Sequence, residues 1–150
     1  MATAPTTDST WPAERHGVAA IVVRRGQLLL GKRLGAHGAG TWALPGGKPN
    51  VGESDLACAV RELFEETGIA GRAVAVVGES RAVFEGNQSW HTSVVLVDAP
   101  TGPAVRREPT KNAGWIWADP TRLPTPLFPP FANFVANGGL ARALAQVAKS

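Results

Sequence analysis

The chain has 150 residues, of which 44% are hydrophobic and 18% are charged, and its formal net charge is +3. This length and composition suit one globular domain built around one core. No apolar segment is long enough to cross a membrane, and no dense basic run indicates a nucleic-acid polymer as the partner.

The single cysteine, Cys58, excludes an intramolecular disulfide, so a reducing cytoplasm is the expected location. We expect Cys58 to be a small packed residue rather than a redox or metal-binding thiol. Residues 1–14 are rich in Ala, Thr, Pro and Ser, which predicts a disordered arm without the apolar core of a signal peptide. Residues 15–150 are expected to form the single domain.

Two β-strands joined by a tight turn are predicted near the start of this domain. An apolar run with β-branched residues at 16–24 predicts the first strand, and Arg25-Gly26 predicts the turn. Residues 27–33 supply the hairpin partner, and three glycines within 34–40 then indicate a loop.

Lys32 and Arg33 end the second of these strands. We expect both side chains to point toward the turn at 44–47, which reads Leu-Pro-Gly-Gly and brings the backbone close to its neighbours. There they either contact the phosphate or base of a substrate, or they form a solvated strand end.

A helix is predicted between Ser54 and Gly68. Ser54 is a good N-cap residue, and Gly68 is a natural stop after the last turn. Between them, residues that are mostly apolar recur at three- and four-residue spacing, and we expect this stripe to be buried. Its members are Leu56, Val60, Leu63, Phe64 and Thr67.

Glu62, Glu65 and Glu66 are expected to form an acidic ridge on the opposite side of this helix. Like charges at this spacing repel, so the ridge is either a solvated face or a cation-binding face. Hard divalent ions prefer oxygen ligands, and Mg²⁺ fits best. Glu53 adds a fourth carboxylate before the helix, and Arg61 lies where it can orient one of the four.

Two longer strands follow the helix. Residues 72–84 are rich in Ala and Val and predict one strand, with a bulge or break at Gly78. Residues 89–98 predict the next strand. Because successive side chains of a strand face opposite ways, Trp90 and His91 should lie on opposite faces, where each either lines a base pocket or packs against the fold.

The last third of the chain combines loops with short elements. A loop is expected over 99–114, a short strand over 115–117, and irregular structure over 119–130, because that last stretch holds five prolines. Residues 131–149 predict an amphipathic helix that is interrupted near 137–139.

The stretch from Gly47 to Ile69 resembles the Nudix box. That pattern reads Gly, five residues, Glu, seven residues, Arg-Glu, an aliphatic residue, any residue, Glu-Glu, any residue, Gly and an aliphatic residue. The chain satisfies every fixed position: Gly47, Glu53, Arg61, Glu62, Leu63, Glu65, Glu66, Gly68 and Ile69. The resemblance implies an α/β (α+β) protein with the Nudix-type α/β/α sandwich, in which a mixed β-sheet lies between helices.

The flanks of the box resemble the MutT-like nucleoside triphosphate diphosphatases. Residues 30–33 precede a glycine-containing loop and the run at 42–47, as they do in that branch. Glu108-Pro109, followed by the strand at 115–117, also matches, which implies that Glu108 is a further metal ligand. Hydrolases of ADP-ribose, dinucleoside polyphosphates and coenzyme A fit less well; the second of these often carry a nearby tyrosine, and this chain has none.

The resemblance implies Mg²⁺-dependent hydrolysis of a nucleoside triphosphate to the monophosphate and pyrophosphate, with Mn²⁺ as the alternative ion. The implied metal ligands are Glu62, Glu65, Glu66, Glu108 and the carbonyl of Gly46. Glu62 or Glu53 is the implied general base, and Arg61 holds Glu53 or a neighbour in place. The expected substrate-binding residues are Lys32, Arg33, Gly47, Trp90 and Trp117.

Two rival functions stay open at this point. One is hydrolysis of a nucleoside diphosphate linked to another moiety, such as ADP-ribose or a nucleotide sugar. The other is a Nudix domain that binds nucleotides without cleaving them, although such domains commonly lose box glutamates that this chain retains. The expected partner is a small nucleotide, canonical or oxidised, bound by a monomer or a homodimer.

Overall fold

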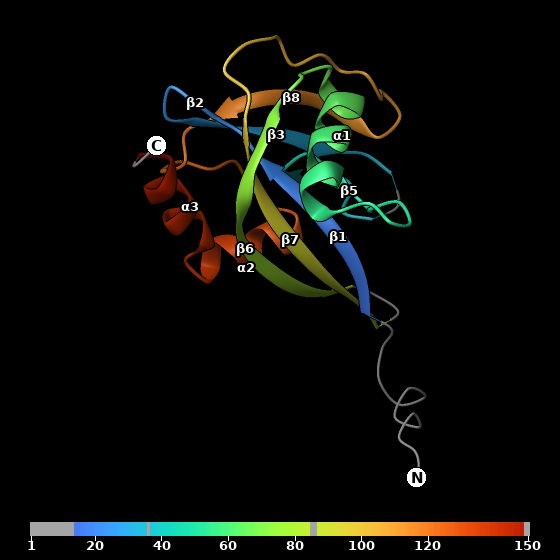
Figure 1. The fold of residues 1–150 in the computed structure, drawn as a ribbon. Helices are drawn as coiled ribbons and strands as arrows, with labels where there is room; N and C mark the ends of the chain where they lie inside the picture. Colours follow the sequence, from blue (N-terminus) through green and yellow to red (C-terminus); the bar gives the residue numbers. More distant parts are fainter. Residues whose placement is uncertain (1–13, 36, 85–86, 149–150) are drawn as a thin grey trace.

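The computed structural model describes residues 14–35, 37–84 and 87–148 (Figure 1). The expected disordered arm falls outside these residues, except that Glu14 begins the first strand. No helix in this part of the chain combines the length and the apolar character that crossing a bilayer requires.

The described residues form eight strands and three helices. In chain order they are β1 (Glu14–Ile21), β2 (Val23–Arg24), β3 (Gln27–Arg33), β4 (Trp42–Ala43), β5 (Gly46–Gly47), α1 (Asp55–Thr67), β6 (Arg72–Phe84), β7 (Gln88–Asp98), β8 (Asn112–Ala118), α2 (Pro129–Ala136) and α3 (Gly139–Ala148).

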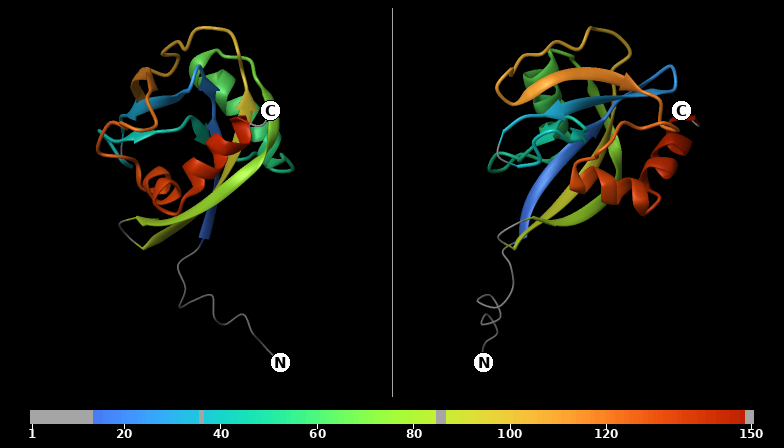
Figure 2. Two further views of the ribbon diagram at one scale, coloured as in Figure 1. Left: turned by 90° about the vertical axis from the view of Figure 1, so that its left-hand side faces the viewer. Right: turned by 180° about the vertical axis from the view of Figure 1, so that it is seen from behind.

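The strands make two sheets. Sheet A has the order β5-β1-β7-β6 and is mixed, because β1 runs parallel to β7 while the other two pairs are antiparallel. Sheet B is antiparallel, with β3 pairing β2, β4 and β8. α1 covers one face of sheet A, and α2 and α3 pack against β6 from the other (Figures 1 and 2). This arrangement confirms the expected class, a mixed sheet between helices.

The first hairpin corrects the single strand expected over 16–24. The chain leaves sheet A for sheet B at Val22, which is fully buried between β1 and β2. Periodicity misses this change because the apolar run continues through it. The turn is confirmed: Arg25 and Gly26 have φ of 51° and 76°, the left-handed values that a tight two-residue hairpin uses.

β6 spans the predicted residues and pairs with β7 along its length. The pairing register shifts between Val76 and Gly78, which confirms the predicted irregularity. The ring of Phe134 in α2 lies over this point, since a Cβ on Gly78 would come within 2.7 Å of a ring carbon. The glycine therefore lets α2 pack closely on the sheet.

The predicted break in the C-terminal helix is also confirmed. α2 ends at Ala136, Gly138 has φ of 86°, and α3 begins at Gly139. α2 begins earlier than expected, at Pro129, because proline fits the first turn of a helix, where its missing N–H has no partner to lose.

α1 begins and ends at the predicted caps. The hydroxyl of Ser54 accepts a hydrogen bond from the N–H of Ala57 at 3.1 Å. Gly68 adopts φ of 79° and donates its N–H to the carbonyl of Phe64 at 2.8 Å. Both contacts satisfy backbone groups that a helix end would otherwise leave unpaired.

The buried face of α1 differs from the expected stripe. Leu63 and Thr67 are buried as predicted, but Leu56 and Phe64 are 38% and 47% exposed. Phe64 is covered instead by the guanidinium of Arg107, which lies 5.2 Å from the ring centroid. The spacing correctly predicted that one face of the helix is buried. It included Leu56 and Phe64 in that face, which the structure leaves partly exposed.

The buried face of α1 contains small side chains where Leu56 and Phe64 were expected. Cys58 and Ala59 are fully buried in the core beneath the helix, as expected for a packed cysteine. Burial raises the pKa of the Cys58 thiol to about 12. The thiol is therefore protonated at neutral pH and is a poor nucleophile.

Candidate active site

The acidic side of α1 lies against the backbone of β5. Gly46 and Gly47 form this short strand and pair with β1 at the edge of sheet A. A Cβ on Gly47 would overlap the carboxylate of Glu62, and one on Gly46 would overlap the carbonyl of Val18. Glycine at both positions therefore brings helix carboxylates and main chain together.

Arg61 gathers three of the four predicted carboxylates. Its Nε and Nη2 each donate to Glu53 at 2.8 Å, and its Nη1 donates to Glu62 at 3.2 Å and Glu65 at 3.1 Å. The hydrogen bonds from Arg61 lower the pKa of Glu53 to about 2, and the same pairing raises the pKa of Arg61. Arg61 thus stands beside Glu53, where the resemblance placed it.

Glu66 lies in a less favourable setting for a charge. One of its oxygens accepts a hydrogen bond from the N–H of Gly46 at 3.3 Å. Burial, together with the negative charges of Glu62 and Glu108, raises the pKa of Glu66 to about 9. The carboxylates of Glu62, Glu66 and Glu108 therefore concentrate negative charge at one place.

This concentration fits a hard divalent cation by its chemistry. All the donors, including the Gly46 backbone, are oxygens, which Mg²⁺ and Mn²⁺ prefer. No three His, Cys, Asp or Glu side chains among the described residues already stand at metal-ligand spacing. An ion would therefore draw the carboxylates together, and Glu65 would have to turn from its contact with Arg61.

A cavity of about 720 Å³ lies beside these carboxylates, a size in the usual range for small-molecule sites. Acidic, aromatic and basic side chains all line it. The acidic ones are Glu62, Glu65, Glu66 and Glu108; the aromatic ones include Phe84, Trp90, Trp115 and Phe128; the basic ones include Arg15, Arg33, Lys48 and Lys111. The cavity is thus lined by a group of carboxylates, here called the acidic wall, and also by aromatic rings and basic side chains.

Arg33 and Trp90 line this cavity, as does Gly47. The guanidinium of Arg33 lies 4.0 Å from the ring centroid of Phe128, and the Nζ of Lys48 lies 5.6 Å from that of Trp90. Burial lowers the pKa of Arg33, so its charge is partly withdrawn from water. Each pair sets a cation beside an aromatic ring.

Lys32 and Glu53 do not line the cavity. Successive residues of a strand face opposite ways, and the residues on either side of Lys32, Gly31 and Arg33, line the cavity. Lys32 therefore faces away from it, and its Nζ lies 6.0 Å from the ring centroid of Trp42. Lys32 was expected to bind substrate, and the structure places it outside this cavity. Glu53 lies behind the guanidinium that holds it.

Trp117 also lies outside the cavity, although Trp115 lines it. The two share a face of β8, but Trp115 pairs with Gly31 and Trp117 with Leu29, about 6.6 Å further along the strand. Arg24 covers the Trp117 ring at 4.7 Å from its centroid. Trp117 was expected to bind substrate, and in the structure its ring packs against Arg24 and the core beneath α1.

Lys48 and Phe128 line the cavity without having been predicted. Lys48 directly follows Gly47, so a basic residue at the first variable position of the box was the available signal. Phe128 comes from the proline-rich segment, which reaches the cavity because Leu127 forms a bridge with Trp42. No local pattern in the sequence indicates that pairing.

Comparison with known proteins agrees with this geometry. A family model described as the NUDIX domain matches residues 14–137. Among solved structures, the MutT NUDIX hydrolase from Burkholderia pseudomallei superposes with a TM-score of 0.74 and 34% identity. The match covers 83% of this chain and 95% of that chain.

Curated relatives share parts of the sequence. A putative 8-oxo-dGTP diphosphatase from Bacillus subtilis (strain 168) is 36% identical over 104 residues, which is 69% of this chain and 64% of the relative. An mRNA-decapping protein of African swine fever virus (isolate Pig/Kenya/KEN-50/1950) is 47% identical over 60 residues, 37% of this chain and 24% of the relative. The chain thus spans less than two thirds of either relative.

The residues that match the NUDIX model are the ones that form the main sheet and the candidate site. The matched residues include all of sheet A, α1 and the strand of two glycines on which the helix carboxylates rest. The box positions are therefore both present in the sequence and assembled in space. This chain belongs to the NUDIX domain family.

Proposed function

We propose that this chain hydrolyses a nucleoside triphosphate to the monophosphate and pyrophosphate, with Mg²⁺ as cofactor and Mn²⁺ as a substitute. The observation that carries the proposal is the meeting of Glu62, Glu66 and Glu108 at a cavity that also contains Trp90 and Arg33. The metal ions that accompany a triphosphate would bind the acidic wall, and the base of the nucleotide would stack on the aromatic rings. The name of the B. subtilis relative supports the same substrate class.

The box carboxylates would hold the metal. The proposed ligands are Glu62, Glu65, Glu66, Glu108 and the carbonyl of Gly46. When bound, Mg²⁺ neutralises charge on the phosphate oxygens and lowers the pKa of bound water. The chain contributes a set of oxygens held together against their own repulsion, which a cation relieves.

Of the two candidate general bases, we propose Glu62. Both oxygens of Glu53 accept from Arg61, and one also accepts from the N–H of Asn50 at 2.9 Å, so Glu53 is a poor proton acceptor. Glu62 lines the cavity and has a single bond to Arg61. Glu62 would take the proton of the attacking water while Arg61, braced by Glu53, fixes its position.

Trp90, Arg33 and Lys48 would bind the nucleotide. The Trp90 ring offers a surface on which a base can stack. The cations of Arg33 and Lys48 lie at the same cavity and suit phosphate oxygens. The backbone of Gly47 also lines this cavity, and we propose that it contacts the phosphates that Arg33 and Lys48 bind.

A hydrolysis screen tests the proposal. The panel contains canonical and oxidised (d)NTPs, ADP-ribose and nucleotide sugars with Mg²⁺, and ion-exchange chromatography resolves the products. We expect monophosphate and pyrophosphate from at least one triphosphate, and a loss on the order of a hundredfold or more in kcat for Glu66→Gln. Asp98→Asn, in an exposed pair with Arg72, is the control and should keep wild-type activity.

Two results would overturn the proposal. Cleavage of ADP-ribose or nucleotide sugars alone would assign the cavity to diphosphate-linked substrates. Nucleotide binding without any cleavage would make the chain a binding domain.

The 5′-triphosphate end of RNA is a second candidate substrate. A relative named RNA pyrophosphohydrolase, from Novosphingobium aromaticivorans, favours it, with 27% identity over 130 residues. Arg15, Lys48 and Lys111 at the cavity could follow a longer phosphate chain. Faster release of pyrophosphate from a 5′-triphosphate RNA oligonucleotide than from free nucleotides would replace the first candidate with this one.

A further inference from the structure

Two histidines face each other on the side of sheet A opposite the cavity. His16 of β1 and His91 of β7 are direct partners in the parallel ladder, 75 residues apart in sequence. Their Nδ1 atoms are 3.3 Å apart and their ring centroids 5.2 Å apart. The ring planes are inclined by 30° to each other, and because the centroids are much farther apart than the nitrogens, the two Nδ1 atoms lie on the facing sides of the rings.

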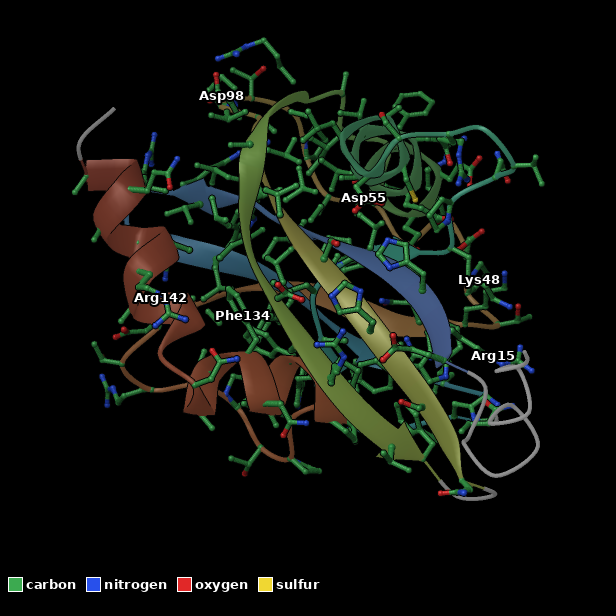
Figure 3. All side chains as sticks on the ribbon, turned by 60° about the horizontal axis from the view of Figure 1, so that its bottom comes forward. Arg15, Lys48, Asp55, Asp98, Phe134 and Arg142 are labelled. Atoms are coloured by element: carbon green, nitrogen blue, oxygen red, sulfur yellow. The ribbon has the colours of Figure 1, made fainter. Side chains whose placement is uncertain are left out.

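A carboxylate holds each ring at its other nitrogen. The Nε2 of His16 is 2.9 Å from Asp55, and the Nε2 of His91 is 2.5 Å from Glu79. Asp55 lies where α1 begins, above β1 and β7 (Figure 3), and Glu79 lies on β6.

These contacts decide which ring nitrogens carry protons. An ionised carboxylate only accepts hydrogen bonds, so each Nε2 must carry a proton and donate it. A neutral imidazole has a single N–H, so both Nδ1 atoms are then bare and direct their lone pairs at each other. Two such nitrogens at this distance repel unless a proton or a metal ion lies between them.

The spacing matches two ligands of one tetrahedral metal ion. Zn–N bonds of about 2.0–2.1 Å place two nitrogens about 3.3–3.4 Å apart at the tetrahedral angle, and the observed separation is 3.3 Å. The same geometry places the two ring centroids about 5.2 Å apart, again as observed. Histidines that bind metals almost always donate their other N–H to a carboxylate or carbonyl, as both rings do here.

We propose that His16 and His91 bind one divalent transition-metal ion, represented by Zn²⁺, at a site separate from the box carboxylates. Nδ1 of each ring is a ligand, and water completes the coordination. The two side chains are 38% and 23% exposed, which leaves room for that water. Imidazole nitrogen favours Zn²⁺, Ni²⁺ or Cu²⁺, whereas carboxylate oxygens favour Mg²⁺, so the two sites select different ions.

The charges around the pair favour a dication over one shared proton. Asp55 and Glu79 contribute two negative charges; a proton offsets one of them, and a dication offsets both. Arg81 on β6 is a competing cation. Its closer ion pair is with Glu14, at 2.9 Å, and it lies farther from Glu79, at 3.9 Å. β1 and β7 are the interior strands of sheet A, so the ligands rest on rigid backbone.

Zn²⁺ titration of the full chain tests this site. Mg²⁺ in excess occupies the box carboxylates, calorimetry measures binding, and long-range ¹H–¹⁵N NMR follows the ring nitrogens. We expect one Zn²⁺ per chain, with the Nδ1 signals of His16 and His91 shifting while each Nε2 keeps its proton. His16→Gln and His91→Gln should each weaken binding by about tenfold or more, and Asp55→Asn by about tenfold. His37→Gln, the remaining histidine of the chain, is the control and should bind as the wild type does.

The wild-type NMR readout keeps the test decisive even where a variant fails to fold. If the Nδ1 signals respond to pH and not to Zn²⁺, the pair shares only a proton and the proposal is wrong. Zn²⁺ binding that survives both histidine substitutions unchanged overturns it equally, because the ion then lies elsewhere. Neither outcome depends on whether the protein hydrolyses nucleotides.

Discussion

Glu66 holds its carboxyl group where the ion-free protein solvates a charge poorly. Its pKa is about 9 in the folded chain, against an ordinary value of 4.5. Between these pH values the unfolded chain releases the proton more readily than the folded chain does. The contribution of Glu66 to the free energy of unfolding therefore falls as the pH rises from 4.5 towards 9.

Glu66→Gln keeps the shape of the side chain and removes this penalty. In EDTA at about pH 8, its Tm should exceed that of the wild type by a few degrees, and the difference should vanish below about pH 4.5. Thermal unfolding followed across this pH range measures the effect. Glu65→Gln, at a half-exposed side chain, is the matched control and should change little. Parallel pH profiles for Glu66→Gln and the wild type would contradict the burial of a costly charge.

Arg61 holds three carboxylates with the planar geometry of its guanidinium. A lysine cannot reproduce that fork, so Arg61→Lys should lower kcat by about tenfold to a hundredfold while KM changes little. Steady-state kinetics on the triphosphate identified by the screen measure both constants. Arg72→Lys, in an exposed ion pair, is the control. A rise in KM with kcat unchanged would show that Arg61 binds substrate instead of positioning carboxylates.

Among the elements, α1 carries most of the proposed site, and its N-terminal cap fixes where it begins. Ser54→Ala removes the acceptor for the N–H of Ala57 and should lower the free energy of unfolding by about 1 kcal/mol. Urea denaturation measures the loss. Ser54→Asp keeps an acceptor at the same place and should retain most of the stability. Equal stability of the alanine and serine proteins would mean that packing alone holds this end of α1.

Elements with a strong local pattern were predictable from the sequence. β3, β6 and both caps of α1 follow from turn residues, glycines and alternation. The division between β1 and β2 at Val22 does not, because only the arrangement of two sheets requires it. The exposure of Leu56 and Phe64 was missed for a related reason: periodicity finds a stripe but not the neighbours that cover it.

In the candidate site, too, residues close together in the sequence were predictable, and contacts between distant segments were not. Glu62, Glu65 and Glu66 share one helix, so their spacing alone predicts that they lie together. Phe128 reaches the cavity through a bridge to β4, which no local pattern encodes. The histidine pair likewise depends on two strands far apart in sequence, and its residues were predictable only as members of those strands.

At the scale of the whole molecule, both sheets and α1 contribute to the cavity, so an ion bound there should stabilise the entire fold. Mg²⁺ at a hundred times its Kd would add about 2.7 kcal/mol, equivalent to a rise in Tm of about 5–10 °C for a chain of this size. Thermal unfolding in Mg²⁺ and in EDTA at matched ionic strength measures the gain. Glu66→Gln should lose most of it. An equal gain in that variant would place the ion away from Glu66.

β1 cannot complete its longest pairing until β7 has been synthesised. Its other partner, β5, offers it only two residues, whereas the ladder with β7 runs from Glu14 to Ile21. A nascent chain that ends before Asp98 therefore presents an apolar strand with open edges, the kind of segment that chaperones bind and that aggregates. Proteolysis of ribosome-bound chains of increasing length should show β1 becoming protected only after Asp98 has left the exit tunnel. The parallel ladder of sheet A thus ties the protection of the first strand of the domain to the synthesis of β7, about 75 residues later in the chain.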